Sequence, residues 1–336
     1  MRHTRSRLLL LVGPLLAPLP ALAQVAGLSG TLIVTNKTPA TATLIDVASG
    51  RTLATLATGN GPHEVVVAKN GSLAVVTDYG AQAPGGTLTV IDLAKREVAR
   101  TIALGEYRRP HGIVFLPGDT VVAVTSETNR AVLLVNVVRA VVVKVIPTEQ
   151  AGSHMVGVTA DGARAFTGNI QSNTVSELDL RAGAYVRRWD VPAQPEAINV
   201  TPDGREVWVG SNATGKVSVL DVASGTVTTA AEGLGWPYRV LFTPDAHTVL
   251  LPDYRGETLR FVDRSSKREL GRIALTGAGP QGIALSADAR YAFLSLSSQG
   301  RVAIVDVARR TLVGHLTAGE TPDGVAYTTR VLLSAR

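Results

Sequence analysis

The sequence predicts an all-β protein, a seven-bladed β-propeller of four-stranded antiparallel blades, and three observations support this. A phrase of two apolar residues followed by Asp or Asn occurs seven times, at intervals of 42 to 46 residues. That period is typical of propellers and related repeat arrays. Each repeat also contains short runs rich in β-branched residues, separated by Pro, Gly, Asn and Asp turns. An opening element, usually built around Pro, begins each repeat.

The repeated phrase marks the third strand of each blade. The fourth copy, Glu177-Leu178-Asp179, keeps only one apolar residue. We expect the polar residue to end its strand and accept N–H bonds from the following turn, which is a structural role. The seven copies end at Asp46, Asp92, Asn136, Asp179, Asp221, Asp263 and Asp306.

The fifth repeat shows the internal order most clearly. After Gln194-Pro195-Glu196, strands are predicted over 197–201, 206–210, 216–221 and 226–230, with Pro202-Asp203-Gly204 as a hairpin turn. A four-stranded unit of about 43 residues cannot cover both of its faces alone, so neighbouring copies must stack. A closed ring of blades leaves no exposed end.

The openers give the number of blades and the closure of the ring. They occur at Pro62, Pro110, Ser153, Pro195, Pro237, Pro280 and Pro322. Residues 30–56 carry three strands without an opener, and the last opener has little chain behind it. We therefore expect a composite N- and C-terminal blade. The predicted repeats are 28–58, 59–105, 106–149, 150–191, 192–234, 235–277 and 278–319, with a closing strand at 320–330 and no assigned place for 331–336.

The first 23 residues have the form of a secretory signal peptide. Arg2, Arg5 and Arg7 precede an apolar stretch over 8–22, and Ala21-Leu22-Ala23 is a small-x-small cleavage site. We expect a mature chain of residues 24–336, beginning at Gln24, as one periplasmic or secreted domain. Three prolines in the apolar stretch argue against a membrane-spanning helix, so no membrane span is expected after cleavage.

Composition excludes several function classes. The chain has no cysteine, so it forms no disulfide, thiolate metal site, Cys nucleophile or covalent c-type haem attachment. Its formal charge of +6 falls to +3 once the three arginines of the leader are removed. Nucleic acid is therefore not expected as a partner, because its binding normally needs a clustered basic surface. We expect a monomer.

Ile33-Val34-Thr35-Asn36, the Val-Ile-Asp-like strand and the Gly-Pro-His opener at 61–63 resemble the YVTN-repeat β-propeller family of exported bacterial and archaeal proteins. The resemblance extends over residues 28–330. Later repeats carry degenerate forms of the tetrapeptide, such as Val75-Val76-Thr77-Asp78. The resemblance implies the fold and says little about chemistry, since propellers host unrelated functions.

One rim of the ring should collect the openers of all blades, because each opener begins an innermost strand. The aligned position carries His63, His111, His154, Glu196, Tyr238, Gln281 and Asp323. We expect these side chains at the channel mouth. Three of the five histidines that follow the leader share this position in consecutive blades, which makes the series the strongest candidate for a ligand-binding rim.

The three histidines suggest two interpretations. With His63, His111 and His154 as metal ligands, and Glu196 as a fourth ligand or general base, a transition metal such as Zn or Cu could bind. Alternatively, the histidines contact neighbouring loops or a ligand as part of a polar ring. Inner strands diverge with radius, which could place ring neighbours too far apart for one metal ion.

A second group of residues is predicted at the same rim. Arginines and aromatic rings there suit a planar anionic ligand, or pack between blades as ordinary loop residues. This group comprises Lys37, Tyr107-Arg108-Arg109, Trp236-Pro237-Tyr238-Arg239 and Tyr254-Arg255.

Three functions remain open from the sequence. The first is a non-catalytic binding or scaffold protein that holds a small ligand or a partner protein at this rim. The second is a metal-dependent hydrolase or lactonase, or a redox enzyme. The third, implied by the resemblance, is an accessory protein of a periplasmic quinoprotein or haem pathway. No complete catalytic motif, such as Gly-x-Ser-x-Gly or His-Glu-x-x-His, is present.

Overall fold

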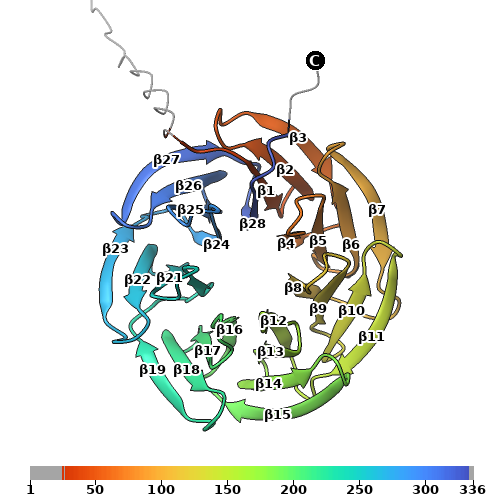
Figure 1. Cartoon of the computed structure of the whole chain (residues 1–336), viewed down its shortest axis with the longest axis vertical. Helices are drawn as coiled ribbons and strands as arrows, with labels where there is room; N and C mark the ends of the chain where they lie inside the picture. Colours follow the sequence, from red (N-terminus) through yellow and green to blue (C-terminus); the bar gives the residue numbers. More distant parts are fainter. Residues whose placement is uncertain (1–24, 26, 333–336) are drawn as a thin grey trace, which may run out of the picture.

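The structure, a computed structural model, describes residue 25 and residues 27–332. Its 28 strands form seven four-stranded antiparallel sheets arranged around a central axis (Figure 1). The predicted seven-bladed propeller is confirmed. Within the described residues, no helix is long and apolar enough to cross a membrane. The predicted signal peptide, residues 1–23, lies outside the described residues.

The four strands of each blade are ordered from the channel outward. Blade 1 contains β28 (Pro322–Thr328), β1 (Thr31–Asn36), β2 (Thr41–Asp46) and β3 (Thr52–Ala57). Blade 2 contains β4 (Pro62–Val67), β5 (Leu73–Gly80), β6 (Pro84–Asp92) and β7 (Glu97–Ala103). Blade 3 contains β8 (Pro110–Phe115), β9 (Val121–Ser126), β10 (Ala131–Asn136) and β11 (Val141–Pro147). Blade 4 contains β12 (Ser153–Val158), β13 (Arg164–Asn169), β14 (Thr174–Asp179) and β15 (Ala184–Asp190).

The remaining blades follow the same order. Blade 5 contains β16 (Pro195–Val200), β17 (Glu206–Ser211), β18 (Lys216–Asp221) and β19 (Val227–Ala231). Blade 6 contains β20 (Leu241–Phe242), β21 (Thr248–Asp253), β22 (Thr258–Asp263) and β23 (Glu269–Ala274). Blade 7 contains β24 (Pro280–Leu285), β25 (Tyr291–Leu296), β26 (Arg301–Asp306) and β27 (Thr311–Thr317).

Blade 1 is the predicted composite blade. The C-terminal β28 pairs antiparallel with β1, in a register that sets Ile33 opposite Ala326 and Val34 opposite Val325 (Figure 1). This pairing closes the ring. Leu332 is buried against the core between blades 1 and 2, so it has a place that the sequence did not suggest.

The core lies between adjacent blades. One apolar cluster, for example, joins Val75 and Leu88 of blade 2 to Val124 and Leu133 of blade 3, all fully buried. Both faces of a blade are therefore covered by its neighbours, which explains why the two middle strands of each blade are apolar on both faces.

The polar residue of the repeated phrase has the predicted structural role. Each of the seven accepts at least one backbone N–H from the turn that follows its strand. Asp46, for example, accepts from Ser49 at 2.9 Å. These side chains fix the turn between the third and fourth strands.

Blade 6 departs from the uniform order predicted for the repeats. Its innermost strand, β20, contains two residues, and the opener Pro237 is joined to Asp253 only by an isolated bridge. Tyr238 and Arg239 lie in this interruption, and their side chains form polar contacts with other blades instead.

Thr35 of the Ile-Val-Thr-Asn tetrapeptide holds two inner strands in place. Its hydroxyl accepts the N–H of Gly324 at 2.8 Å and donates to the carbonyl of His63 in the next blade at 2.9 Å. Thr125 in blade 3 makes the equivalent bonds to Gly112 and to the carbonyl of His154. The second strand of a blade thus positions the opener backbones.

Asn36, the last residue of the tetrapeptide, fixes the loop before the opener. It accepts the N–H of Gly319 at 2.9 Å and donates to the hydroxyls of Thr41 and Thr43. Asp78 occupies the equivalent position in blade 2. It accepts from the N–H of Gly59 and from two threonine hydroxyls, Thr87 and Thr89. The tetrapeptide is therefore a structural clip.

Burial of the Asp78 carboxylate predicts that the stability of the fold depends on pH. Burial raises the pKa of Asp78 from 3.8 to about 6, despite opposing hydrogen bonds from Thr87, Thr89 and Gly59. Because the folded-state pKa is the higher one, the fold gains stability below pH 4 and loses it as pH rises through 6. The loss is up to about 3 kcal/mol. Asp78→Asn should remove this slope, and Asn36 indicates that an amide fits the clip. Urea unfolding of wild type and Asp78→Asn from pH 4 to 7 measures this pH dependence. If the free energies of unfolding of the two proteins follow parallel curves against pH, the prediction is wrong.

Candidate functional site

The opener residues meet at one end of the central channel. They occupy the second position of β4, β8, β12, β16, β24 and β28, and Tyr238 precedes β20. In blades 1 to 5 and 7 the pairing with the second strand shifts register at this point. Such bulges redirect side chains. All seven side chains are buried apart from His63, whose side chain is 19% exposed. We call the seven residues the opener cluster.

The three histidines form one continuous contact. The rings of His111 and His154 stack with centroids 3.6 Å apart, and His111 Nε2 lies 3.1 Å from His63 Nδ1. His111 Nδ1 faces the Met155 sulfur at 3.3 Å. The network assigns the His63 proton to Nδ1, which also faces Asp323 Oδ2 at 3.2 Å. His111 Nε2 is then an acceptor.

His111 is held neutral by its surroundings. Burial is the main cause of a pKa well below 6.5, and the adjacent His154 and His63 lower it further. His154 is anchored instead by Glu127, whose Oε2 lies 2.7 Å from His154 Nδ1. Tyr79 donates to the same carboxylate at 3.2 Å. Burial and the Glu127 charge raise the pKa of Tyr79 to about 12, so the phenol remains a donor.

Asp323 is the fully buried anion of the cluster. Tyr238 donates to its Oδ1 at 2.9 Å, and Lys37 Nζ and His63 Nδ1 each lie 3.2 Å from its Oδ2. Burial alone would raise the pKa of Asp323, but Lys37, His63 and Arg239 hold it below its ordinary value. The carboxylate is therefore ionised. Asp323 joins residues from blades 1, 2 and 6 at the mouth.

An ion pair crosses the channel between blades 6 and 2. Arg239 of blade 6 donates to Glu64 of blade 2, and its guanidinium lies 4.3 Å from the centre of the Tyr238 ring. Burial raises the pKa of Glu64, whereas Arg239 acts in the opposite direction. Both side chains are nearly buried, with 9% and 13% exposed. Each charge therefore depends on the other for its solvation.

Glu196, the predicted general base, is engaged in contacts of its own. It accepts from Trp236 Nε1 at 3.0 Å and from Asn212 Nδ2, and Arg239 lies 4.0 Å away. These donors hold the carboxylate group in a fixed position. The contacts favour a positioning or binding role.

The metal hypothesis gains no support from this geometry. Across residues 25 and 27–332, no three His, Asp or Glu side chains are arranged so that they could hold one metal ion. Two of the predicted ligands, His63 and His111, face each other, and His154 turns its Nδ1 to Glu127. The ligand role of His63, His111 and His154 thus rests on the sequence alone.

The arginines and aromatic residues of the second predicted group do not converge on one binding site. Arg109 lies over the ring of Tyr79, with its guanidinium carbon 4.7 Å from the ring centre. Arg255 stacks on Trp236, and the ring of Tyr254 meets Trp236 edge-on. Arg239 is committed to Glu64. The guanidinium groups therefore have separate partners.

Sequence reasoning missed Glu64, although a signal was present. The residue after each opener position is Glu64, Gly112, Met155, Ala197, Arg239, Gly282 and Gly324 in chain order. The glycines have no room for a side chain: a Cβ at Gly324 would lie 2.5 Å from the carbonyl oxygen of His63. The two charged members of the series are the pair that crosses the channel. Opposite charges at equivalent positions could have indicated this contact.

The fold and mouth define a seven-bladed propeller with a buried polar cluster in its channel. Residues 118–247 match the family model of the YNCE-like beta-propeller. Together with the seven blades, this match supports a propeller of the YVTN/YNCE type. No curated protein matches the chain.

Solved structures share the fold at low sequence identity. A functionally unknown protein from Desulfotomaculum acetoxidans DSM 771 is 16% identical with a TM-score of 0.74, covering 89% of this chain and 99% of its own. Hydrazine synthase from Kuenenia stuttgartiensis is 17% identical with a TM-score of 0.68, covering 79% of this chain and 89% of that chain. These likenesses concern the fold alone.

The ion pair between Arg239 and Glu64 leads to a prediction about stability. Arg239→Leu leaves Glu64 buried without a partner and should lower the free energy of unfolding by about 3–5 kcal/mol at pH 7. Adding Glu64→Leu removes the stranded charge and should restore most of the loss. Urea unfolding of the single and double variants measures both effects. Arg181→Leu is the control, because its pair with Asp161 joins side chains that are 73% and 61% exposed and contributes little to stability. A double variant as unstable as Arg239→Leu would contradict the prediction.

Proposed function

We propose that this chain is an exported, non-catalytic binding protein that holds a small polar ligand at the opener cluster. The observation that carries the proposal is a pair of buried acceptors, Gln281 Oε1 and Asn212 Oδ1, that have no hydrogen-bond partner among the described residues. Unpaired buried acceptors are costly and rare in native proteins, and a ligand that donates to them removes the cost.

The chemistry of the mouth favours a ligand rich in N–H donors. Both unpaired atoms are acceptors, and the carboxylates of Glu196 and Asp323 belong to the same opener series. Trp236 and Tyr254 lie beside Glu196 and Tyr238, where aromatic faces attract cations. A primary amine or guanidinium compound meets these requirements better than an anion, because Arg239, Arg109 and Arg255 already have partners.

A thermal-unfolding screen with putrescine, agmatine and arginine tests the binding. A saturable rise in Tm of about 2 °C or more is expected for one of them with the wild-type protein. In Gln281→Leu the rise should be lost. Without ligand, this variant should be at least as stable as wild type, because an unpaired buried amide is gone.

His247→Gln serves as the control, since His247 lies in the exposed turn between β20 and β21, away from the openers. Two results would overturn the proposal. One is the absence of a saturable response to all three compounds. The other is a response that Gln281→Leu and Asn212→Leu leave unchanged. If no small molecule binds and a partner protein is captured by wild type but not by Gln281→Leu, the ligand of this site is a side chain or terminus of that protein.

Export is part of the same proposal and has its own test. The basic residues, apolar stretch and Ala-Leu-Ala site of the first 23 residues support cleavage before Gln24. Expression of the full chain in a Gram-negative host should yield periplasmic protein whose N-terminal residue is Gln24. Ala21→Arg and Ala23→Arg together should block processing. Unprocessed wild-type protein in the cytoplasm would contradict export.

A further inference from the structure

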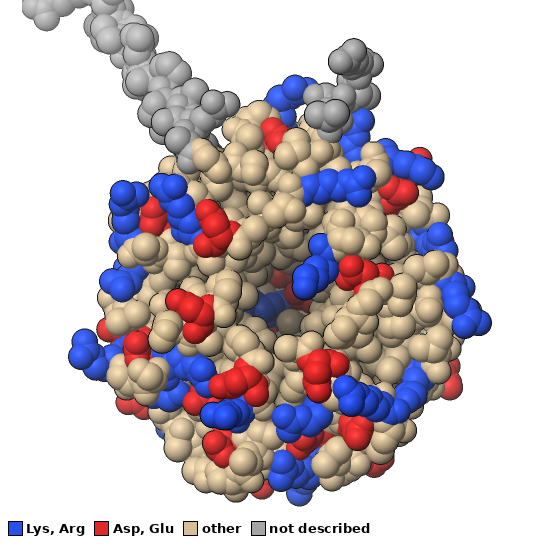
Figure 2. Space-filling model, in the orientation of Figure 1, with Lys and Arg blue, Asp and Glu red and all other residues tan. Residues whose placement is uncertain are grey.

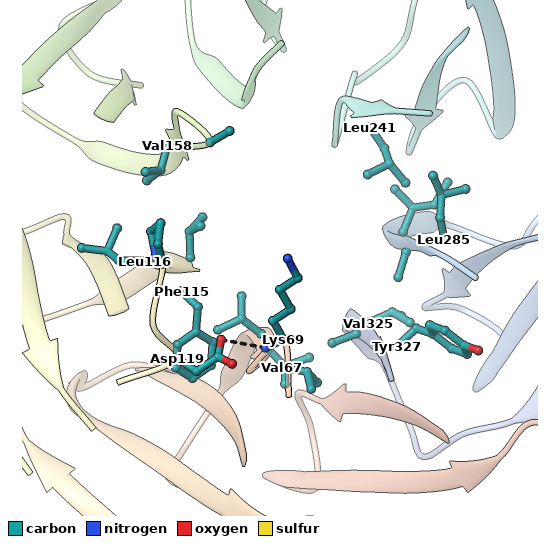
Figure 3. A pocket seen from close by; sticks show the side chains of 18 of the residues that line it. Val67, Lys69, Phe115, Leu116, Asp119, Val158, Leu241, Leu285, Val325 and Tyr327 are labelled. Carbon is teal, nitrogen blue, oxygen red and sulfur yellow. Dashed lines mark hydrogen bonds between the residues drawn. The ribbon is translucent and has the colours of Figure 1, made fainter. Parts of the chain in front are cut away.

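The channel ends in a cavity at the side away from the opener cluster. Its volume is about 760 Å³, which lies within the range of small-molecule sites. The wall is formed where the inner strands end, with Val67 of β4, Phe115 of β8, Val158 of β12 and Leu285 of β24 (Figure 3). The openers lie at the other ends of the same strands. The two sites are thus separate.

The wall of this cavity is apolar and only half-buried. Phe115, Leu116, Val158, Leu241 and Leu285 are all partly exposed, and they come from four blades. Figure 2 shows the ring hollowed at its centre on the face in view. Apolar side chains that converge on a concave, accessible surface are typical of a site that binds an apolar group.

Lys69 is the cation of this lining. The close-up shows its side chain reaching into the cavity, with the ammonium group pointing away from Asp119 (Figure 3). Asp119, the other charged lining residue, is used otherwise: its carboxylate accepts the backbone N–H of Lys69 at 2.8 Å and of Asn70 at 3.0 Å. These bonds fix the turn that carries Lys69. The ammonium remains available to a ligand.

The deeper part of the channel adds no net charge to the site. A narrower cavity of about 190 Å³ continues toward the openers and shares Val65, Val114 and Leu241 with the larger one. Glu64 and Arg239 lie in its lining, and they neutralise each other. Of the two charged side chains beside the apolar wall, Asp119 is bonded to the backbone of the turn, and the Lys69 ammonium is the one that extends into the cavity (Figure 3).

We propose that this cavity binds a small amphiphilic anion, with an apolar chain between the inner strands and one carboxylate at Lys69. The inference goes beyond the proposed function, because it concerns a second site with the opposite ligand charge. The apolar wall supplies most of the affinity by removing the chain from water. Lys69 supplies the preference for an acid over a neutral compound of the same shape.

Calorimetric titration with decanoate and decan-1-ol tests the proposal, because the two differ only in the head group. Decanoate should bind with a Kd below about 1 mM, and Lys69→Gln should weaken it by about fivefold or more while leaving decan-1-ol within about twofold. Leu241→Asp should abolish binding of both compounds. Val158→Asp is the second such variant, for the case in which Leu241→Asp fails to fold.

Lys95→Gln is the matched control, since Lys95 is 67% exposed in the turn after β6 and lies outside the cavity lining. It should leave both titrations unchanged, and so should Gln281→Leu at the other end of the channel. The proposal is overturned if decanoate does not bind to the wild-type protein. It is also overturned if Lys69→Gln weakens the binding of decanoate and decan-1-ol equally, or weakens neither. A third contradicting result is that Leu241→Asp and Val158→Asp both fold and still bind decanoate.

Discussion

The pairing of β28 with β1 is the constraint on which the rest of the structure depends. Each blade buries both faces against its neighbours, so an open ring would expose two apolar faces at once. Closure also builds the mouth directly. Asp323 lies on β28 and Lys37 follows β1, so their 3.2 Å contact joins the two ends of the domain. Thr35 completes the link by bonding Gly324 and His63.

The channel that this closure creates has two chemically different ends. At the opener end, Asp323, Glu64 and Arg239 are buried charges from blades 1, 2 and 6, each of them paired. At the far end the same strands present Val67, Phe115 and Leu285. The difference arises within six-residue strands, because each begins with a polar opener and a bulge and ends with apolar residues. One fold thus offers a polar site and an apolar site along one axis.

The ring of blades could be predicted because the sequence features that indicate it repeat at a regular interval. The Asp46 to Asp306 series, the openers and the composite blade each repeat or complete a local pattern, and local patterns determine blades. For Tyr238 and Arg239 the sequence predicted a place at the rim but did not indicate the residues that they contact. Their partners, Asp323 and Glu64, are 85 and 175 residues away. No local rule sets such contacts, since they depend on which blades face each other across the closed ring.

The same reasoning explains why the opener series could be found while its chemistry could not. Alignment of the repeats indicates that His63, His111 and His154 share a position, but the position alone is compatible with ligands of a metal or with a stacked ring system. The outcome depends on residues outside the series. Glu127 holds the Nδ1 atom of His154 while that ring stacks on His111, and Met155 and Gly112 set how closely β8 and β12 approach. A repeat protein can therefore change its ligand by substitutions beside the repeated position, with the repeat itself unchanged.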